Sequence, residues 1–159
     1  MNYRYLFCIF LGVLGCKPGD SATDPQRDAA VSVSRIDGRT QYTFSVPHSI
    51  FGIHDTITAS MTATNIGAVP ETLGINYGWL LWALKDSTGR TITSGPGVMS
   101  SYLMMRVLEP LQSAEIGSMY VPITDTSGRP VIAGTYALQA LGYGDWTFAS
   151  PMSIQISLQ

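Results

Sequence analysis

The side chains best suited to general base chemistry in this sequence are two histidines, His48 and His54. A hydrolytic triad needs a nucleophile, a base and an orienting acid within hydrogen-bond distance, and these two histidines are the candidate bases. His54 and Asp55 are adjacent, so on a strand their side chains would point to opposite faces. We interpret them as polar residues of a loop between two strands. No G-x-S-x-G, H-E-x-x-H or phosphate-binding glycine loop occurs in the sequence, which predicts that the protein is not an enzyme.

Three aspartates are the candidate ligands for a metal ion. Asp86, Asp125 and Asp145 carry the oxygen ligands that calcium prefers, but they lack the dense alternating spacing of a calcium loop. Two separate histidines do not form a zinc site. The segments 86–89 and 125–128 each have Asp first and Gly fourth, a pattern typical of type I turns. We therefore expect each aspartate to stabilise the turn in which it lies, and we expect no metal and no cofactor.

Cys16 has surroundings that indicate a covalent modification. Arg4 is followed by an apolar run over residues 5–14, and the small Gly15 precedes Cys16, which is the layout of a bacterial secretory signal. The run is about ten residues, half of the roughly 20 that a membrane-spanning helix needs. The sequence Val13-Leu-Gly-Cys16 resembles the lipobox of bacterial lipoproteins. That resemblance implies a diacylglyceryl group on the Cys16 thiol; in the alternative, an ordinary cleaved signal, Cys16 is incidental.

The segment after the signal has the composition of a tether. Residues 16–30 are rich in Pro, Gly, Ser and Asp and show no periodicity, so they cannot bury enough apolar surface to offset their ordering entropy. We expect a signal peptide over residues 1–15, the lipidated Cys16 with a disordered tether over 16–30, and a folded domain over 31–159. The protein would then be exported and lipid-anchored to the bacterial cell membrane or outer membrane. Under the sorting rule of enteric bacteria, Lys17 rather than Asp after the lipidated cysteine favours the outer membrane.

The charge balance restricts the partners. The chain has nine Lys and Arg residues against eleven Asp and Glu residues, a net charge of −2. Loss of Arg4 with the signal would make the balance slightly more acidic. Such a chain has no basic surface for nucleic acid, so we expect no nucleic-acid partner.

The pattern of residues 31–159 predicts an all-β fold. Residues 56–64 alternate between apolar and hydroxyl side chains, and residues 153–158 repeat the alternation, which is the period of a half-buried antiparallel strand. Further runs rich in β-branched and aromatic residues cover 41–46, 79–85, 101–108, 116–123 and 135–141. No window has helical periodicity. We predict an immunoglobulin-like antiparallel β-sandwich of about seven to eight strands.

Several short motifs carry a family resemblance. Asn65-Ile-Gly67 follows one predicted strand, Leu108-Glu-Pro110 ends another, and Gly134-Thr-Tyr136 opens a third. In this order they resemble the immunoglobulin-like domain of the bacterial intracellular proteinase inhibitor (BsuPI) family, over roughly residues 42–158. Leu111 follows Pro110 where that family usually has Gly. The resemblance implies the sandwich fold and, as one possible activity, proteinase inhibition; it marks no inhibitory residue.

Aromatic residues are the candidates for a binding surface. Trp79 and Trp82 are three positions apart, so on a regular strand they face opposite sides. We assign Trp82 to the core, which leaves Tyr77 and Trp79 as candidates for a surface patch. Tyr143 and Trp146 lie at the predicted loop between the last two strands, where they would either contact a sugar or protein, or fold back onto the core.

Tyr136 and the methionines leave further alternatives open. Tyr136 either packs in the core or fastens a corner of the sandwich through a hydrogen bond to nearby backbone. Met99, Met104 and Met105 either fill core gaps or form an adaptable contact surface.

Together these features predict a lipid-anchored binding module of the cell envelope that interacts with an envelope protein and has no catalytic activity. The alternatives are a proteinase inhibitor of the BsuPI type and a glycan-binding module.

Overall fold

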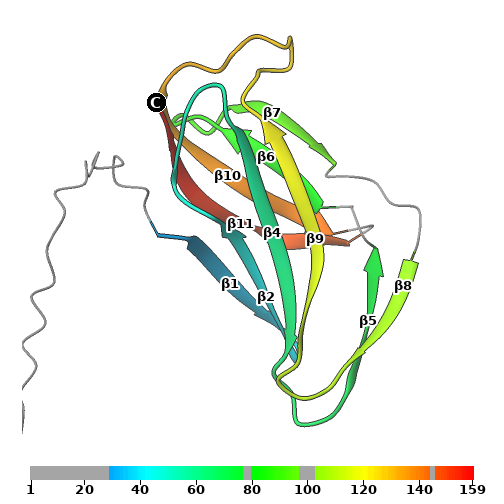
Figure 1. Cartoon of the computed structure of the whole chain (residues 1–159). Coiled ribbons are helices and arrows are strands. Elements are labelled where there is room, and N and C mark those ends of the chain that lie inside the picture. Colours follow the sequence, from blue (N-terminus) through cyan, green and yellow to red (C-terminus); the bar gives the residue numbers. More distant parts are fainter. Residues whose placement is uncertain (1–28, 77–79, 97–102, 144–145) are drawn as a thin grey trace, which may run out of the picture.

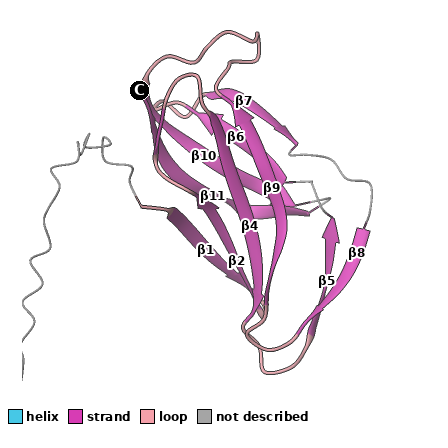
Figure 2. Cartoon of the chain, in the orientation of Figure 1, coloured by secondary structure: helices cyan, strands magenta, loops and turns pink. Residues whose placement is uncertain are grey.

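The computed structural model of the chain describes residues 29–76, 80–96, 103–143 and 146–159. These residues are all-β, and Figure 2 shows strands and loops but no helix. The strands are β1 (Val31–Asp37), β2 (Thr40–Val46), β3 (Ile50–Phe51), β4 (Thr56–Asn65), β5 (Glu71–Asn76), β6 (Leu80–Lys85), β7 (Thr91–Pro96), β8 (Leu103–Leu108), β9 (Ser113–Pro122), β10 (Gly134–Tyr143) and β11 (Trp146–Leu158).

The strands form two facing sheets and one separate pair (Figure 1). The first sheet has the order β1-β2-β4-β9, the second has the order β3-β11-β10-β6-β7, and β5 pairs with β8. Neighbouring strands are antiparallel, except that β3 runs parallel to β11. The chain crosses repeatedly between the two sheets, as in the immunoglobulin-like fold. The predicted β-sandwich is confirmed.

The two sheets share one apolar core because their strands alternate with a period of two. Every second residue of β2 and β4 is buried, and β9 alternates over much of its length. The largest fully buried side chains come mostly from the two sheets: Phe44, Ile57, Met61, Ile116 and Met119 from the first, Leu80, Leu84, Leu138, Ile156 and Leu158 from the second, and Leu108 from β8 of the separate pair. Trp82 is 5% exposed, which confirms its assignment to the core.

Hydroxyl side chains occupy the opposite face of the first sheet. Pairs of them bridge neighbouring strands, with 2.9 Å between the oxygens of Ser34 and Thr43 and 3.0 Å between those of Ser45 and Ser60. Such cross-strand pairs help to hold the sheet together. The sheet thus has one apolar and one polar face, as the alternation in residues 56–64 predicts.

The structure contains more strands than the seven or eight expected. The additional ones are β1, β3, β5 and β7, which include three sheet-edge strands and one member of the separate pair. β3, β5 and β7 are short or contain Gly, so their sequences carry a weaker periodic signal, whereas residues 31–34 of β1 do alternate and were missed. β3 has only two residues, and β7 ends in Gly95 and Pro96.

Tyr136 fastens a corner of the sandwich near the start of β10. Its hydroxyl donates a hydrogen bond of 2.9 Å to the carbonyl oxygen of Ile132, and its ring is buried. This confirms the corner alternative for Tyr136. Burial raises the pKa of the hydroxyl above its ordinary value, so the tyrosine stays protonated as a donor.

The connections between strands gather at two ends of the molecule. In Figure 1 the β4–β5 and β8–β9 connections lie at the lower end, and the long β9–β10 connection lies at the upper end. None of the residues that the structure describes forms a helix long and apolar enough to cross a membrane.

Candidate functional site

The two histidines lie close to β3 and serve different roles. The Nδ1 of His48 lies 2.6 Å from the carbonyl oxygen of Ile50, which can only accept, so Nδ1 carries the proton. The His48 ring also packs against Phe51, with 4.2 Å between ring centroids. His48 therefore helps to hold the β2–β3 connection in place.

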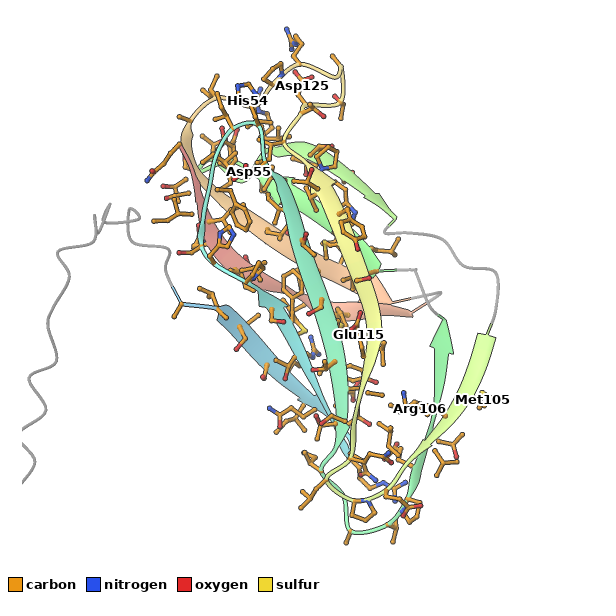
Figure 3. All side chains as sticks on the ribbon, in the orientation of Figure 1. His54, Asp55, Met105, Arg106, Glu115 and Asp125 are labelled. Atoms are coloured by element: carbon orange, nitrogen blue, oxygen red, sulfur yellow. The ribbon has the colours of Figure 1, made fainter. Side chains whose placement is uncertain are left out.

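His54 and Asp55 lie in the loop between β3 and β4, as predicted. Both are exposed, and Figure 3 shows them at the upper end of the molecule. The Asp55 carboxylate accepts a 2.7 Å hydrogen bond from the backbone N–H of Gly52 within the same loop. Over the described residues, no three His, Cys, Asp or Glu side chains gather closely enough to hold a metal ion.

Asp86 and Asp125 organise the two predicted turns. The backbone N–H of Gly89 donates to the carbonyl oxygen of Asp86 at 2.9 Å, and Gly128 does the same to Asp125 at 2.9 Å. Gly89 has a φ of 84° and Gly128 a φ of 77°, a left-handed conformation that glycine adopts without strain. Both turn predictions are confirmed.

The carboxylate of each aspartate is bonded inside its own turn. Asp86 accepts hydrogen bonds from the Thr88 hydroxyl at 2.6 Å, from the backbone of Thr88 and Arg90, and from the Arg90 side chain. These bonds, that from the Thr88 hydroxyl above all, lower the pKa of Asp86 to about 2. A hydrogen bond from the Arg129 backbone lowers the pKa of Asp125 in the same way.

The aromatic candidates and Cys16 are only partly covered by the structure. Cys16, Tyr77 and Trp79 lie outside the described residues. Tyr143 and Trp146 form the last backbone pair of the β10–β11 hairpin, so they do lie at the connection between the final two strands. Their side chains are outside what the structure describes.

A different surface emerges at the lower end of the molecule. Two connections meet there, residues 66–70 between β4 and β5 and residues 109–112 between β8 and β9. Four exposed apolar side chains lie on these connections or next to them, and we call this group the apolar end: Ile66, Val69, Val107 and Leu111. Figure 3 places Met105 and Arg106 of β8 toward the same end. Met105 is exposed, which favours the contact-surface alternative for that methionine.

Asn65 holds the two connections together. It is fully buried, and its side-chain amide donates to the carbonyl oxygens of Val69 at 2.8 Å and Leu108 at 2.9 Å. Its side-chain oxygen accepts from the backbone N–H of Gly67 at 2.8 Å. Its own carbonyl accepts from the backbone N–H of Leu111 at 2.7 Å. One buried residue thus fixes the backbone of both connections, because all these polar groups would otherwise lack partners.

The first turn of the molecule adds to this end. The backbone N–H of Ile66 donates to the carbonyl oxygen of Arg39 at 2.8 Å, and the Arg39 guanidinium forms an ion pair of 3.2 Å with Glu71. The β1–β2 turn is therefore attached to the β4–β5 connection. A Cβ at Gly67 would lie 2.9 Å from the Arg39 side chain, so these segments are in close contact.

Leu111 is the unusual residue of the apolar end. Its φ of 65° lies in the left-handed region, where an L-residue other than Gly, Asn or Asp is strained by roughly 1–2 kcal/mol. Its side chain is 79% exposed, so burial does not compensate for the strain. Sequence reasoning noticed Leu111 as a departure from a glycine position but did not assign it to a site. The sequence signal for a positive φ at this position was Leu111 itself, which follows Pro110 where the BsuPI family usually has Gly.

Comparison with known proteins gives no family. No protein-family model and no curated protein matches the chain. Similar solved structures include a β-glucosidase from Erythrobacter marinus, with 15% identity and a TM-score of 0.41 over 82% of this chain. They also include a β-glucosidase from Listeria innocua in complex with glucose, with 10% identity and a TM-score of 0.41 over 79% of this chain. A third is an alkylpurine DNA glycosylase from Pseudomonas fluorescens, with 16% identity and a TM-score of 0.42 over 72% of this chain.

The matched parts of those proteins are small. The chain spans 16% of the length of each of these two glucosidases and 28% of the DNA glycosylase. At these TM-scores the similarities carry no argument about fold or function.

Proposed function

We propose that this chain is a lipid-anchored module of the bacterial cell envelope that binds a partner protein through its apolar end and has no catalytic activity of its own. The observation that carries the proposal is Leu111, an exposed leucine in a strained backbone conformation. Its strain opposes folding, its exposed side chain contributes almost no burial to offset that strain, and a glycine at this position would avoid the strain. Local strain that the surrounding structure maintains is characteristic of functional sites.

The shape and rigidity of the apolar end support a protein partner. Leu111, Ile66 and Val69 lie on connections that Asn65 fixes through buried hydrogen bonds. A preorganised surface loses little conformational entropy on binding, and exposed apolar groups gain from being covered. The exposed side chain of Leu111 requires an apolar recess on the partner. An aliphatic side chain in such a recess is a common form of interface anchor.

The position of the predicted tether also fits this proposal. β1 begins at Val31, directly after the tether, and leads over seven residues to the turn that contacts the β4–β5 connection. At about 3.3 Å per residue the apolar end lies roughly 20 Å along the domain from the attachment point. Anchored through Cys16 to the cell membrane or the outer membrane, the module would have this end available to another envelope protein.

Proteinase inhibition remains the second candidate, since an inhibitor also needs an exposed and rigid loop. The apolar end provides such a loop around Leu111, and its BsuPI-like motifs are those that build the loop. A glycan-binding function would depend on four aromatic side chains: Tyr77, Trp79, Tyr143 and Trp146. These side chains lie outside those that the structure describes.

Crosslinking in native membranes tests the proposal. The lipidated chain and its Leu111→Asp variant are crosslinked in membranes of the source cells, and the captured proteins are identified by mass spectrometry. Asp tolerates the left-handed conformation, so this variant removes the apolar contact without adding strain. The matched control is Ile132→Asp, which alters a residue of similar exposure, 78%, outside the apolar end.

We expect one partner to be captured by the wild type and by Ile132→Asp but not by Leu111→Asp. Equal capture by all three chains would show that the apolar end is not the interface. A captured proteinase whose activity falls on stoichiometric binding would make inhibition the function instead.

A further inference from the structure

Two turns with the same five-residue pattern line a single cavity. This cavity lies at the other end of the molecule from the apolar end. The first is Asp86-Ser-Thr-Gly-Arg90 between β6 and β7, and the second is Asp125-Thr-Ser-Gly-Arg129 between β9 and β10. The cavity has a volume of about 710 Å³, within the range of sites for small molecules. Figure 3 shows Asp125 at the upper end, far from Met105 and Arg106.

The lining of the cavity combines hydroxyl groups with apolar surface in about equal parts. Thr91, Thr126 and Thr135 contribute hydroxyls, and Ile92 and Val131 contribute apolar surface. Hydroxyl groups can both donate and accept hydrogen bonds, as the hydroxyls of a polyol do. The lining therefore suits a ligand with many hydroxyl groups.

The carboxylates of the two turns are engaged in hydrogen bonds, whereas the guanidinium groups keep N–H donors that are free among the described residues. Both aspartate carboxylates already accept several hydrogen bonds each, from the backbone and from the arginine of the same turn. Arg90 pairs with its aspartate through Nε, and Arg129 pairs through Nε and Nη2. Among the described residues, Nη1 and Nη2 of Arg90 and Nη1 of Arg129 have no partner.

Each turn contributes one carboxylate and one guanidinium, so the charges balance, and what remains open to a ligand, within the part of the chain that the structure describes, is the unpaired guanidinium N–H groups. The Arg90 side chain is 77% exposed and that of Arg129 is 78% exposed, so both guanidinium groups are accessible to a ligand. A guanidinium group matches the geometry of carboxylate and phosphate oxygens. Since each aspartate keeps its arginine oriented, the donors are held in place before a ligand arrives.

We propose that this cavity binds an oxyanion, either a carboxylate or a phosphate, carried on a saccharide or polyol. Arg90 and Arg129 bind the anionic group, and the hydroxyls of Thr91, Thr126 and Thr135 bind the hydroxyl groups of the ligand. The site is separate from the apolar end and does not require the lipid anchor, so it adds a second binding function to the one proposed above.

Calorimetric titration of the purified full chain tests this site with three probes of stated chemistry. Digalacturonate carries carboxylates on a saccharide, glycerol 3-phosphate carries a phosphate on a polyol, and digalactose is the neutral control. The variants are Arg90→Gln and Arg129→Gln. The matched control, Arg106→Gln, removes the same charge from an exposed residue of β8.

We expect at least one anionic probe to bind, with no binding of digalactose. Each cavity variant should weaken that binding about tenfold or more, since a charge-assisted hydrogen bond is lost, whereas Arg106→Gln should leave it unchanged. Which anionic probe binds more tightly identifies the source as an acidic saccharide or a polyol phosphate. Thermal unfolding of each variant confirms that it is folded before titration.

Three results would overturn the proposal: binding of neither anionic probe, equal binding of digalactose, or equal weakening in all three arginine variants. The Leu111→Asp variant should bind the probes as the wild type does. Loss of partner capture and loss of oxyanion binding are therefore separate results.

Discussion

Leu111 combines a strained backbone conformation with an exposed side chain. We predict that Leu111→Gly raises the free energy of unfolding by about 1 kcal/mol, because glycine adopts a φ of 65° without strain. The gain is less than the full strain, since glycine also increases the entropy of the unfolded chain. Urea denaturation of wild type and variant measures the difference.

Ile132 provides the control for this prediction. It is 78% exposed but is not among the residues with positive φ. Ile132→Gly should lower the free energy of unfolding by roughly 0.4–1 kcal/mol, because glycine increases the conformational entropy of the unfolded chain. A fall of the same size in Leu111→Gly would contradict the strain assigned to Leu111.

Asn65 is the second residue on which the apolar end depends. Asn65→Asp keeps the shape but replaces the amide nitrogen with an oxygen that faces the carbonyl oxygens of Val69 and Leu108. Two acceptors then lose their donor inside a buried site, which should lower the free energy of unfolding by about 3 kcal/mol. Urea denaturation at neutral pH measures the loss.

Gln112, in the β8–β9 connection, is the control for Asn65→Asp. It tests whether any polar substitution in these connections lowers the free energy of unfolding. The Gln112 side chain accepts one exposed hydrogen bond of 2.9 Å from the backbone N–H of Glu109. Gln112→Ala should therefore cost no more than about 1 kcal/mol. If both variants had equal effects, Asn65 would not be the group that holds the two connections.

Among the elements, the β6–β7 turn makes stability depend on pH. The pKa of Asp86 is lowered from 3.8 to about 2 in the folded protein, so the folded state favours the ionised form. Its contribution to stability is complete above about pH 4 and is lost as the pH falls toward 2. We predict that the urea midpoint falls over this range.

The Asp86→Asn variant isolates that contribution. Asparagine does not ionise, so the variant should be less stable than wild type at pH 6 and should lose less stability between pH 4 and pH 2. The lowered pKa of Asp125 acts in the same direction within its own turn. Parallel pH profiles for wild type and Asp86→Asn would mean that the turn does not contribute in this way.

At the scale of the whole molecule, the proposed membrane location depends on a lipid attached to Cys16. We predict that Cys16→Ser abolishes labelling by radioactive palmitate and blocks maturation, because serine lacks the thiol that the lipobox-like motif presents. Cells expressing wild type and variant are labelled, and the immunoprecipitated chain is examined by autoradiography. Persistent labelling of the variant would place the lipid elsewhere and remove Cys16 as the anchor.

The sandwich itself was predictable from the sequence, because a period of two in residues 56–64 and 153–158 reports directly which side chains face a core. The turns at Asp86 and Asp125 were predictable for a similar reason, since an aspartate and a glycine three positions apart determine the local backbone. Trp82 was assigned to the core because it lies in a predicted strand that carries the family resemblance, whereas alternation alone only placed Trp79 and Trp82 on opposite faces. These features depend on neighbours within a few residues.

Contacts between distant segments were decided by the tertiary structure alone. The hydrogen bond from Asn65 to Leu108 joins residues 43 positions apart, and the shared cavity joins two turns from different parts of the chain. The sequence identified Leu111 and both Asp-Gly turns as patterns but gave no sign of what they face. Local sequence determines backbone conformation and burial. Packing of the two sheets determines which loops become neighbours, and both proposed binding sites are formed by loops that this packing brings together.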